Sequence, residues 1–369
     1  MGELRLMKGN EVLAEAAIRC GCDGYFGYPI TPQSEVMETL MERQPWNETG
    51  MVVLQAESEV AAINMIYGAA GTGKRVMTSS SSPGISLMSE GISYIAGAEL
   101  PCLVINVQRG GPGLGTIQPS QADYFQAVKG GGHGDYKMIV LAPSSVQEMN
   151  DFVSLAFDLA FKYRNPAMIL TDGALGQMME KVVLSDYKKR WTSEEVLSRW
   201  GSWATTGKPS SRERNIITSL ELDSQKMEMN NRRFQEKYRR MEAEEQRYET
   251  IHCDDAEYIL VAFGTSARVC QKATEIAREK GIPVGLLRPV TLFPFPNDIV
   301  GQLARKVKGF LSVEMNAGQM IEDVKRAVYQ AGSICPVEFY GRMGGIIPSP
   351  GEVVEAIEQK FLQEDRRWT

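Results

Sequence analysis

Short apolar runs alternate with longer amphipathic segments over the first half of the chain. The apolar runs have the length of buried strands, and the amphipathic segments repeat their apolar residues at helical spacing. Strands are predicted at 24–29, 51–56, 75–81, 101–108, 137–143 and 166–173, and helices at 11–21, 31–43, 58–71, 83–97 and 145–163. Because short apolar strands separated by helices form parallel sheets covered on both faces, the pattern predicts an α/β domain from Gly9 to about Leu184.

The pattern changes between Lys188 and about Thr250. Periodicity is weak at first, and residues 223–249 are mostly charged with a thin apolar stripe, which predicts a linker and a solvated helix that packs on one side. Alternation then resumes, with strands predicted at 257–264, 283–290 and 309–315 and helices at 266–281, 297–309, 319–332 and 349–362. We therefore expect a first domain at 1–187, a charged linker or insert at 188–250, and a smaller α/β domain at 251–369.

Two helix starts carry specific signals. Thr31 is a candidate N-cap with Pro32 at the first helical position, where a missing N–H costs nothing. Ser145 and Glu148 have the spacing of a capping box.

Composition narrows the class of protein. Hydrophobic content of 43% and charged content of 23% are typical of a globular protein, and a net charge of −6 gives no basic footprint for nucleic acid. No apolar run is long enough to span a bilayer and the start has no apolar signal core, so we expect a cytoplasmic protein without membrane contact. The cysteines are scattered without a C-x-x-C pair, and we assign no metal ligand to this chain.

The stretch "GAAGTGKR", residues 68–75, has the glycine and lysine spacing of a phosphate-binding loop. Arg75 stands where such loops have Ser or Thr, and the predicted order is helix, turn, strand rather than the reverse. The stretch is therefore read as the end of a helix, with ATP binding through Lys74 as a remote alternative.

Four stretches follow predicted strands, where parallel α/β sheets bind ligands: "YPITP", "QAESE", "TSSSSPG" and "QRGGPGLG". At helical spacing Glu59 shares a face with Ala62, Ile63 and Ile66, which predicts a desolvated carboxyl suited to acid–base work. A first-turn glutamate that answers the helix dipole at the solvent edge is equally compatible with the sequence.

The other three stretches carry polar groups for which a purely structural role is also compatible with the sequence. Thr31 is either a ligand-facing hydroxyl or a plain cap, and the serines before Pro83 form either a cradle for a polar ligand or an ordinary loop. Arg109 suits a carboxylate or phosphate, although a structural ion pair would account for it equally well. His133 lies in a glycine loop and receives no role.

Long motifs resemble one family. "GYFGYPITPQSEVMETL", "QAESEVAAINMIYGAA", "SSSSPGISLMSEGISYIAGAELPCLVINVQRGGPGLG", "PSQADYFQAVKGGGHGDY" and "EFYGRMGG" are similar to the α subunit of 2-oxoacid:ferredoxin oxidoreductases, most of all to the branched-chain (3-methyl-2-oxobutanoate, or 2-ketoisovalerate) group. The resemblance implies a parallel-sheet, pyrimidine-type thiamine diphosphate-binding domain and a smaller transketolase C-terminal-like α/β domain. A non-catalytic scaffold on the same fold is the other class of protein that the motifs allow.

The resemblance also implies roles for named residues. Glu59 of the E-S-E motif would hydrogen-bond the aminopyrimidine ring of thiamine diphosphate and activate it. Thr31 and Arg109 would hold the carboxylate of the 2-oxo acid. The remaining cofactor contacts would come from Tyr28, Pro29, Ile30, Ser81 and Ser82.

The implied reaction is oxidative decarboxylation of a 2-oxo acid to an acyl-coenzyme A, with electrons passed through iron–sulfur clusters to ferredoxin. The chain lacks the G-D-G…N diphosphate motif and cysteine runs, so a β subunit is expected to supply the diphosphate and Mg²⁺ site and further subunits the clusters. An α–α contact is also possible. 2-Oxoglutarate is the alternative substrate, and its second carboxylate would need an extra cation such as Arg342.

Overall fold

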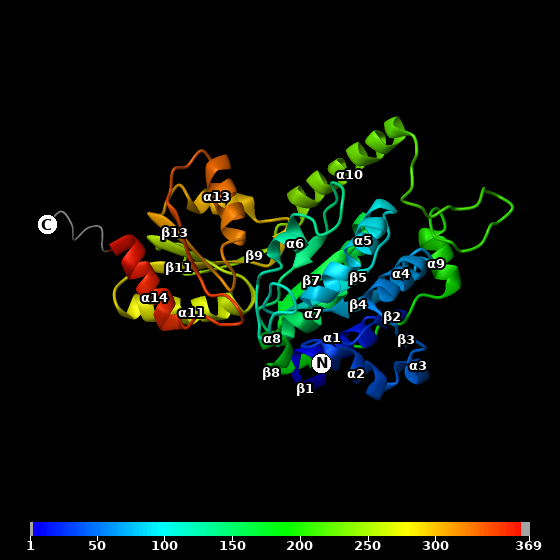
Figure 1. The fold of residues 1–369 in the computed structure, drawn as a ribbon, viewed down its shortest axis with the longest axis horizontal. Coiled ribbons are helices and arrows are strands. Elements are labelled where there is room, and N and C mark those ends of the chain that lie inside the picture. The colour runs from blue at the N-terminus through cyan, green and yellow to red at the C-terminus, as the bar shows by residue number, and fades with distance from the viewer. Residues whose placement is uncertain (1–2, 363–369) are drawn as a thin grey trace.

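The computed structural model describes residues 3–362 and contains two main sheets, which lie side by side in Figure 1. The larger sheet has seven strands in the order β12-β6-β7-β5-β4-β2-β3. Its six N-terminal strands are parallel, as predicted: β2 (Gly24–Gly27), β3 (Val52–Gln55), β4 (Val76–Ser80), β5 (Leu103–Gln108), β6 (Ile139–Leu141) and β7 (Ala167–Asp172).

Helices cover both faces of this sheet. On one face α1 (Gly9–Arg19) packs on α7 (Val146–Tyr163), and on the other α4 (Glu59–Ala70) packs on α5 (Ser82–Gly97). Shorter helices occupy the connections: α2 (Ser34–Arg43), α3 (Pro45–Glu48), α6 (Tyr124–Val128) and α8 (Gly173–Gln177). The core between them is apolar, so the double cover expected for a parallel sheet is confirmed.

The second sheet has five strands in the order β14-β13-β10-β11-β9. Their bounds are β14 (Val337–Gly341), β13 (Gly309–Glu314), β10 (Tyr258–Val261), β11 (Val284–Pro289) and β9 (Tyr248–Ile251), the last antiparallel. Helices α11 (Gly264–Glu279) and α14 (Pro350–Ile357) pack together on one face, with a π-helical turn at Glu358–Leu362, and α12 (Asn297–Leu303) packs with α13 (Met320–Gln330) on the other. This is the smaller α/β domain that the sequence predicts.

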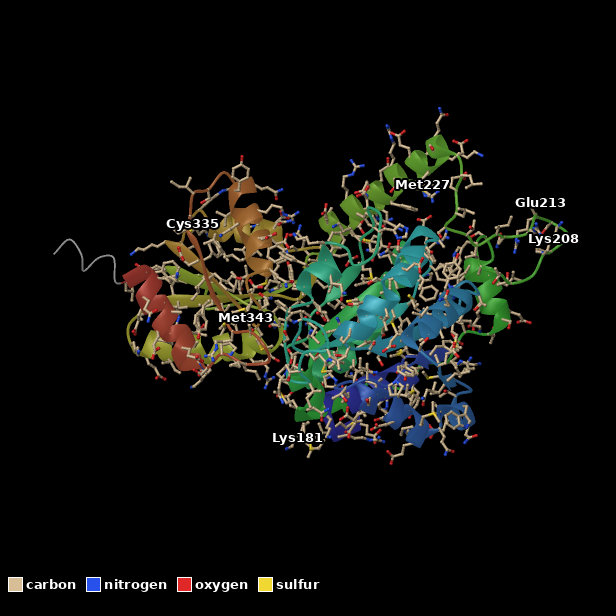
Figure 2. The ribbon with its side chains drawn as sticks, in the orientation of Figure 1. Lys181, Lys208, Glu213, Met227, Cys335 and Met343 are labelled. Carbon is tan, nitrogen blue, oxygen red and sulfur yellow. The ribbon has the colours of Figure 1, made fainter. Side chains whose placement is uncertain are left out.

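The insert between the sheets contains two helices. Helix α10 (Ser224–Glu244) buries Phe234, Tyr238 and Met241 along one side, which confirms the thin apolar stripe. Helix α9 (Ser193–Trp200) was missed, although Thr192 and Glu195 form a capping box at its start. Figure 2 shows Lys208 and Glu213 at the outer end of the loop that joins the two helices.

Five strands were not predicted from periodicity: β9 and β14 at the two edges of the smaller sheet, and β1, β8 and β12. Strand β1 (Glu3–Lys8) pairs with β8 (Met179–Leu184) in a small antiparallel sheet, and both carry many polar residues. Strand β12 (Thr291–Phe293) belongs by sequence to the second half but pairs antiparallel with β6 in the first sheet. Long-range pairing of short strands leaves little local signal.

The predicted cap at Thr31 is wrong. Helix α2 begins at Ser34 after Gln33, because Gln33 N–H donates to Ile30 O and closes a turn over residues 30–33. At α7 half of the predicted box forms. Ser145 Oγ accepts from Glu148 N–H, whereas the Glu148 carboxylate accepts from Ser144 N–H and pairs with Arg288.

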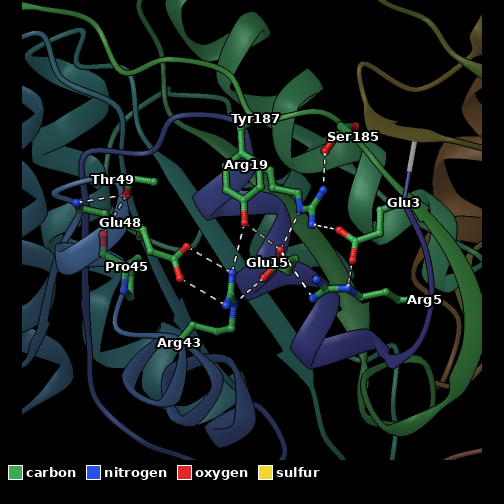
Figure 3. Close-up of polar contacts among 11 residues, drawn as sticks. Glu3, Arg5, Glu15, Arg19, Arg43, Pro45, Glu48, Thr49, Ser185 and Tyr187 are labelled. Atoms are coloured by element: carbon green, nitrogen blue, oxygen red, sulfur yellow. Dashed lines mark hydrogen bonds and ion pairs between the residues drawn. The ribbon is translucent and has the colours of Figure 1, made fainter. Parts of the chain in front are cut away.

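A buried ion-pair cluster joins α1 to its surroundings (Figure 3). Glu15 is 0% exposed, and its carboxylate accepts from Arg19 at 2.7 Å and from Arg43 at 3.0 Å. Arg19 also pairs with Glu3 and donates to Ser185 O. Burial opposes the charge on Arg19, but the hydrogen bonds that it donates to Glu15 and Glu3 raise its pKa.

Two further observations concern the expectations about membrane contact and metal ligands. No helix within residues 3–362 is long and apolar enough to cross a membrane. Over the same residues, no three His, Cys, Asp or Glu side chains gather as metal ligands would.

Candidate active site

The four stretches singled out in the sequence follow four neighbouring strands. Strands β5, β4, β2 and β3 are adjacent in the sheet, and they end before Arg109, Ser81, Tyr28 and Ala56 respectively. Because these strands are parallel, their carboxyl ends share one edge of the sheet. The stretches therefore meet at the place where such sheets bind ligands.

Glu59 is the first residue of α4 and lies on its buried side. Ser58 caps the helix by accepting from Ala61 N–H at 3.2 Å, which turns Glu59 inward with Ala62, Ile63 and Ile66. Glu59 is only 6% exposed, so it lies on the buried side of the helix, as the helical spacing predicts. Among the described residues its carboxylate has no hydrogen-bond or ion-pair partner, and its oxygens are not sealed from solvent, so they can accept a hydrogen bond from a ligand.

Gly84 permits the close approach of α5 to Glu59. A Cβ atom built on Gly84 would lie 2.8 Å from Glu59 Oε1 and 2.1 Å from Ser80 Oγ. The hydroxyls of Ser80 and Ser81 are buried without a partner in the described structure. The start of α5 thus offers unsatisfied polar groups beside an unpaired carboxylate.

The "YPITPQ" loop, residues 28–33, is held by buried hydrogen bonds. Gln33 Nε2 donates to Tyr28 O at 3.0 Å, and Gln33 Oε1 accepts from Ser79 Oγ at 2.6 Å. Tyr25 completes this network through Ser79, and burial raises the pKa of Tyr25 to about 12. Tyr28, Pro29 and Ile30 are half-buried and Thr31 is exposed. The buried hydrogen bonds therefore fix one side of the loop, and the side with Thr31 is open to solvent.

Arg109 is 8% exposed and reaches the same loop. Its Nη1 donates to Thr31 O at 2.9 Å and its Nη2 to Leu114 O at 3.1 Å, whereas its Nε has no partner among the described residues. The structure thus brings Arg109 and Thr31 together, and the alternative of a structural ion pair for Arg109 does not hold. Nε is sealed from solvent, but each Nη atom carries a second N–H, and these donors suit an incoming carboxylate.

Ser82 and Asp123 connect Arg109 to α5. Ser82 Oγ accepts from Arg109 N–H at 3.0 Å and donates to Asp123 Oδ2 at 2.6 Å. Asp123 Oδ2 also accepts from Asn106 Nδ2 at 2.9 Å. Burial raises the pKa of Asp123 above its ordinary value, although these hydrogen bonds oppose the rise.

A cavity of about 640 Å³ opens between the two sheets beside this group. Ser82, Arg109 and the glycine loop line one wall, and Met315, Asn316 and Met343 line the other. Figure 2 shows Met343 between the two domains. Arg109 is the one cation among the described residues that line the cavity.

Several singled-out residues lie elsewhere. Lys74 donates to Trp191 O at 2.7 Å, and α4, the turn and β4 follow in the predicted order, which removes the basis for a phosphate-binding loop. Arg342 pairs with Glu352 and does not line the cavity. His133 is exposed, and Ser93 Oγ donates to its carbonyl.

Sequence reasoning missed Gln33, Gly84 and Asp123. Each stands inside a quoted motif, but the contacts that define them join segments 25 to 46 residues apart. A Gly directly after the Ser-Pro start of a helix was the one available signal for a close approach.

The fold and site define a class of protein. The family model described as pyruvate flavodoxin/ferredoxin oxidoreductase, thiamine diphosphate-binding, matches residues 15–252, and that of pyruvate:ferredoxin oxidoreductase core domain II matches residues 256–353. The chain therefore belongs to the 2-oxoacid:ferredoxin oxidoreductase family, as its motifs indicate.

Individual relatives narrow this class. The chain is 51% identical over 96% of its length to ketoisovalerate oxidoreductase subunit VorB of Methanothermobacter thermautotrophicus, and covers 97% of that protein. It is 35% identical, also over 96% of its length, to 2-oxoglutarate synthase subunit KorA of Methanocaldococcus jannaschii, of which it covers 99%. The branched-chain group is thus the more similar one, as expected from the motifs.

Solved structures agree on the architecture. The 2-oxoglutarate:ferredoxin oxidoreductase from Magnetococcus marinus, solved with 2-oxoglutarate, coenzyme A and succinyl-CoA bound, superposes with a TM-score of 0.84 at 26% identity. The match covers 97% of the present chain but 65% of that one. A split-gene transketolase superposes with a TM-score of 0.60 at 13% identity, which supports the fold alone.

Proposed function

We propose that this chain is the subunit that activates thiamine diphosphate in a 3-methyl-2-oxobutanoate (2-ketoisovalerate):ferredoxin oxidoreductase. The assembled enzyme oxidatively decarboxylates the branched-chain 2-oxo acid to an acyl-coenzyme A and passes the electrons to ferredoxin. The observation that carries the proposal is Glu59, a buried carboxylate left without a partner at the ligand-binding edge of the sheet.

The residues around Glu59 fit the cofactor's aminopyrimidine. When bound, thiamine diphosphate supplies a carbon nucleophile and an electron sink. Glu59 holds a proton at the ring nitrogen, and the low-dielectric pocket strengthens that hydrogen bond. Ser81, Ser82 and residues 28–30 are the proposed walls of the pocket.

Arg109 and Thr31 are the proposed clamp for the substrate carboxylate. Each Nη atom of Arg109 keeps a second N–H beyond those donated to Thr31 O and Leu114 O, and the Thr31 residue is exposed. Holding the carboxylate at C1 orients the bond that breaks during decarboxylation. We assign the C-terminal wall of the cavity, with Met315 and Met343, to the acyl side of the reaction, where coenzyme A enters.

The branched-chain substrate is favoured over 2-oxoglutarate on charge. A second carboxylate needs a second cation, and the described lining of the cavity offers Arg109 alone, since Arg342 is paired with Glu352. Relatives named for ketoisovalerate share about half of their residues with this chain. The diphosphate, Mg²⁺ and iron–sulfur sites are assigned to partner subunits.

The test is anaerobic co-purification with the partner subunits, followed by reduction of a viologen dye. We expect turnover that requires thiamine diphosphate and coenzyme A, with kcat/KM for 3-methyl-2-oxobutanoate at least about tenfold above that for 2-oxoglutarate. A higher kcat/KM for 2-oxoglutarate would instead identify 2-oxoglutarate as the substrate of the assembled enzyme. Turnover unaffected by loss of thiamine diphosphate would end the proposal.

A further inference from the structure

The Ser120–Phe125 segment runs between the proposed substrate clamp and the second domain. It follows the glycine loop and leads into α6. One side of it contacts Ser82 and Asn106 in the first sheet, and the other contacts residues after β13.

Asp123 anchors the side of the segment that faces the proposed substrate clamp. Its Oδ2 atom accepts from Ser82 Oγ at 2.6 Å and from Asn106 Nδ2 at 2.9 Å, and its N–H donates to Gln108 Oε1 at 3.1 Å. Ser82 Oγ is then oriented to accept from Arg109 N–H at 3.0 Å. The carboxylate thus fixes the main chain of Arg109 through a single hydroxyl.

Residues of the second domain anchor the opposite side of the Ser120–Phe125 segment. Gln319 Nε2 donates to Ala122 O at 2.8 Å, and Gln319 Oε1 accepts from Phe125 N–H at 2.8 Å. Asn316 Nδ2 donates to Gln121 O at 2.8 Å. Asp123 sits between these anchors, so its position depends on both domains.

We propose that Asp123 is a positioning residue that aligns Arg109 with the substrate carboxylate by hydrogen-bonding Ser82. The inference rests on the proposed role of Arg109 as the clamp. It explains why a carboxylate stands near a site for an anionic substrate, where its charge alone would oppose binding. What the site gains from Asp123 is a strong acceptor with fixed geometry.

The test uses the assembled enzyme and compares Asp123→Ala with Asp123→Asn. In Asp123→Ala, Ser82 loses its charged acceptor and keeps only Arg109 O at 3.2 Å, so we expect KM for the 2-oxo acid to rise about tenfold or more with a smaller change in kcat. In Asp123→Asn the amide oxygen still accepts from Ser82 and Asn106, so we expect KM within about threefold of the parent value. Asp135→Asn, at an exposed aspartate in the loop between α6 and β6, is the matched control.

A double variant separates this inference from the proposed function. In an Arg109→Ala background, Asp123→Ala should have no further effect on KM, because the residue that it positions is gone. If Arg109→Ala itself leaves KM unchanged, the clamp is misassigned and the proposed function loses its substrate site. If Arg109→Ala raises KM but Asp123→Ala does not, or if Asp123→Asn is as impaired as Asp123→Ala, positioning by Asp123 is wrong and the clamp stands.

A second-domain variant tests the far anchor. Gln319→Ala removes the hydrogen bonds to Ala122 and Phe125 without touching the cavity's cation, and we expect a KM increase in the same direction but smaller than that of Asp123→Ala. Gln330→Ala, at the exposed end of the same helix, is the control. Equal KM values for the two glutamine variants would contradict the dependence on the second domain.

Discussion

Two buried glutamates on opposite faces of the first sheet are treated in opposite ways. Glu15 on α1 is 0% exposed and accepts from Arg19 and Arg43, with Arg5 and Tyr187 close by. Glu59 on α4 is 6% exposed, and the described chain gives its carboxylate no partner at all. Burial is therefore common to both, and only the supply of partners differs.

The difference in partners distinguishes a carboxylate that stabilises the fold from one that is available to bind a ligand. A buried charge is tolerated when arginines neutralise it, as around Glu15. A buried carboxyl without a partner costs folding free energy, and such a cost persists where it serves function. The contrast predicts that activity and stability respond oppositely at the two sites.

Glu59→Gln should produce the largest effect, on activity. The amide keeps the shape of the side chain but cannot hold a proton as a carboxyl does, so we expect turnover of the assembled enzyme to fall about 10²- to 10⁴-fold. The melting temperature should stay unchanged or rise, because a buried unpaired carboxylate is removed. Viologen reduction and calorimetry measure the two effects, with Glu57→Gln, at an exposed neighbour, as the control. Full activity in Glu59→Gln would remove the central observation of the proposed function.

Glu15→Gln should show the reverse, a large effect on stability. Loss of the charge leaves buried Arg19 and half-buried Arg43 without their shared partner, and we expect the free energy of unfolding to drop by about 3 kcal/mol. The assembled enzyme that remains folded should keep its kcat and KM. Denaturant titration reports the loss, and Glu38→Gln on the exposed side of α2 serves as the control. A stability equal to that of the parent would mean that the cluster in Figure 3 contributes little.

Gly84→Ala should affect both properties moderately. The added methyl group would meet Ser80 Oγ at 2.1 Å and Glu59 Oε1 at 2.8 Å, so α5 or the carboxylate must move. We expect a loss of stability of about 1–3 kcal/mol and lower turnover, because Glu59 is displaced. Gly68→Ala on α4 has open space around the same atom and should be neutral or slightly stabilising.

Glu244→Gln should give the smallest effect, and one that depends on pH. Hydrogen bonds from Arg240, Lys162 and Tyr163 lower the pKa of Glu244 from 4.5 to about 2. A lowered folded-state pKa stabilises the fold above pH 4.5, and that contribution is lost as the pH falls from 4.5 toward 2. The variant should therefore melt slightly below the parent at pH 7, and the gap should close near pH 2. Glu236→Gln on the same exposed face should show no gap at either pH.

The elements that periodicity predicts are those with local signals. The inward face of α4, with Glu59 beside Ala62 and Ile63, follows from helical spacing alone. The helix end before Lys74 follows from the order of elements. Both are properties of a few consecutive residues.

What the sequence could not predict depends on distant partners. Thr31 does not cap α2, because Gln33 bonds back to Ile30 and is itself held by Ser79 of another strand. The buried state of Glu15 and the link from Asp123 to Ser82 likewise need contacts across 28 and 41 positions. Residue type gave no sign of which glutamate would be neutralised.

Strand β12 has a consequence for how the molecule holds together. It reaches from the C-terminal half to complete the outer edge of the larger sheet, and Arg288 just before it pairs with Glu148 at 2.6 Å. A protease cut near residue 253 would break the covalent connection between the two halves. The pieces would still associate through the pairing of β12 with β6. The halves should consequently melt in one transition, and neither is expected to serve as a stand-alone module for engineering.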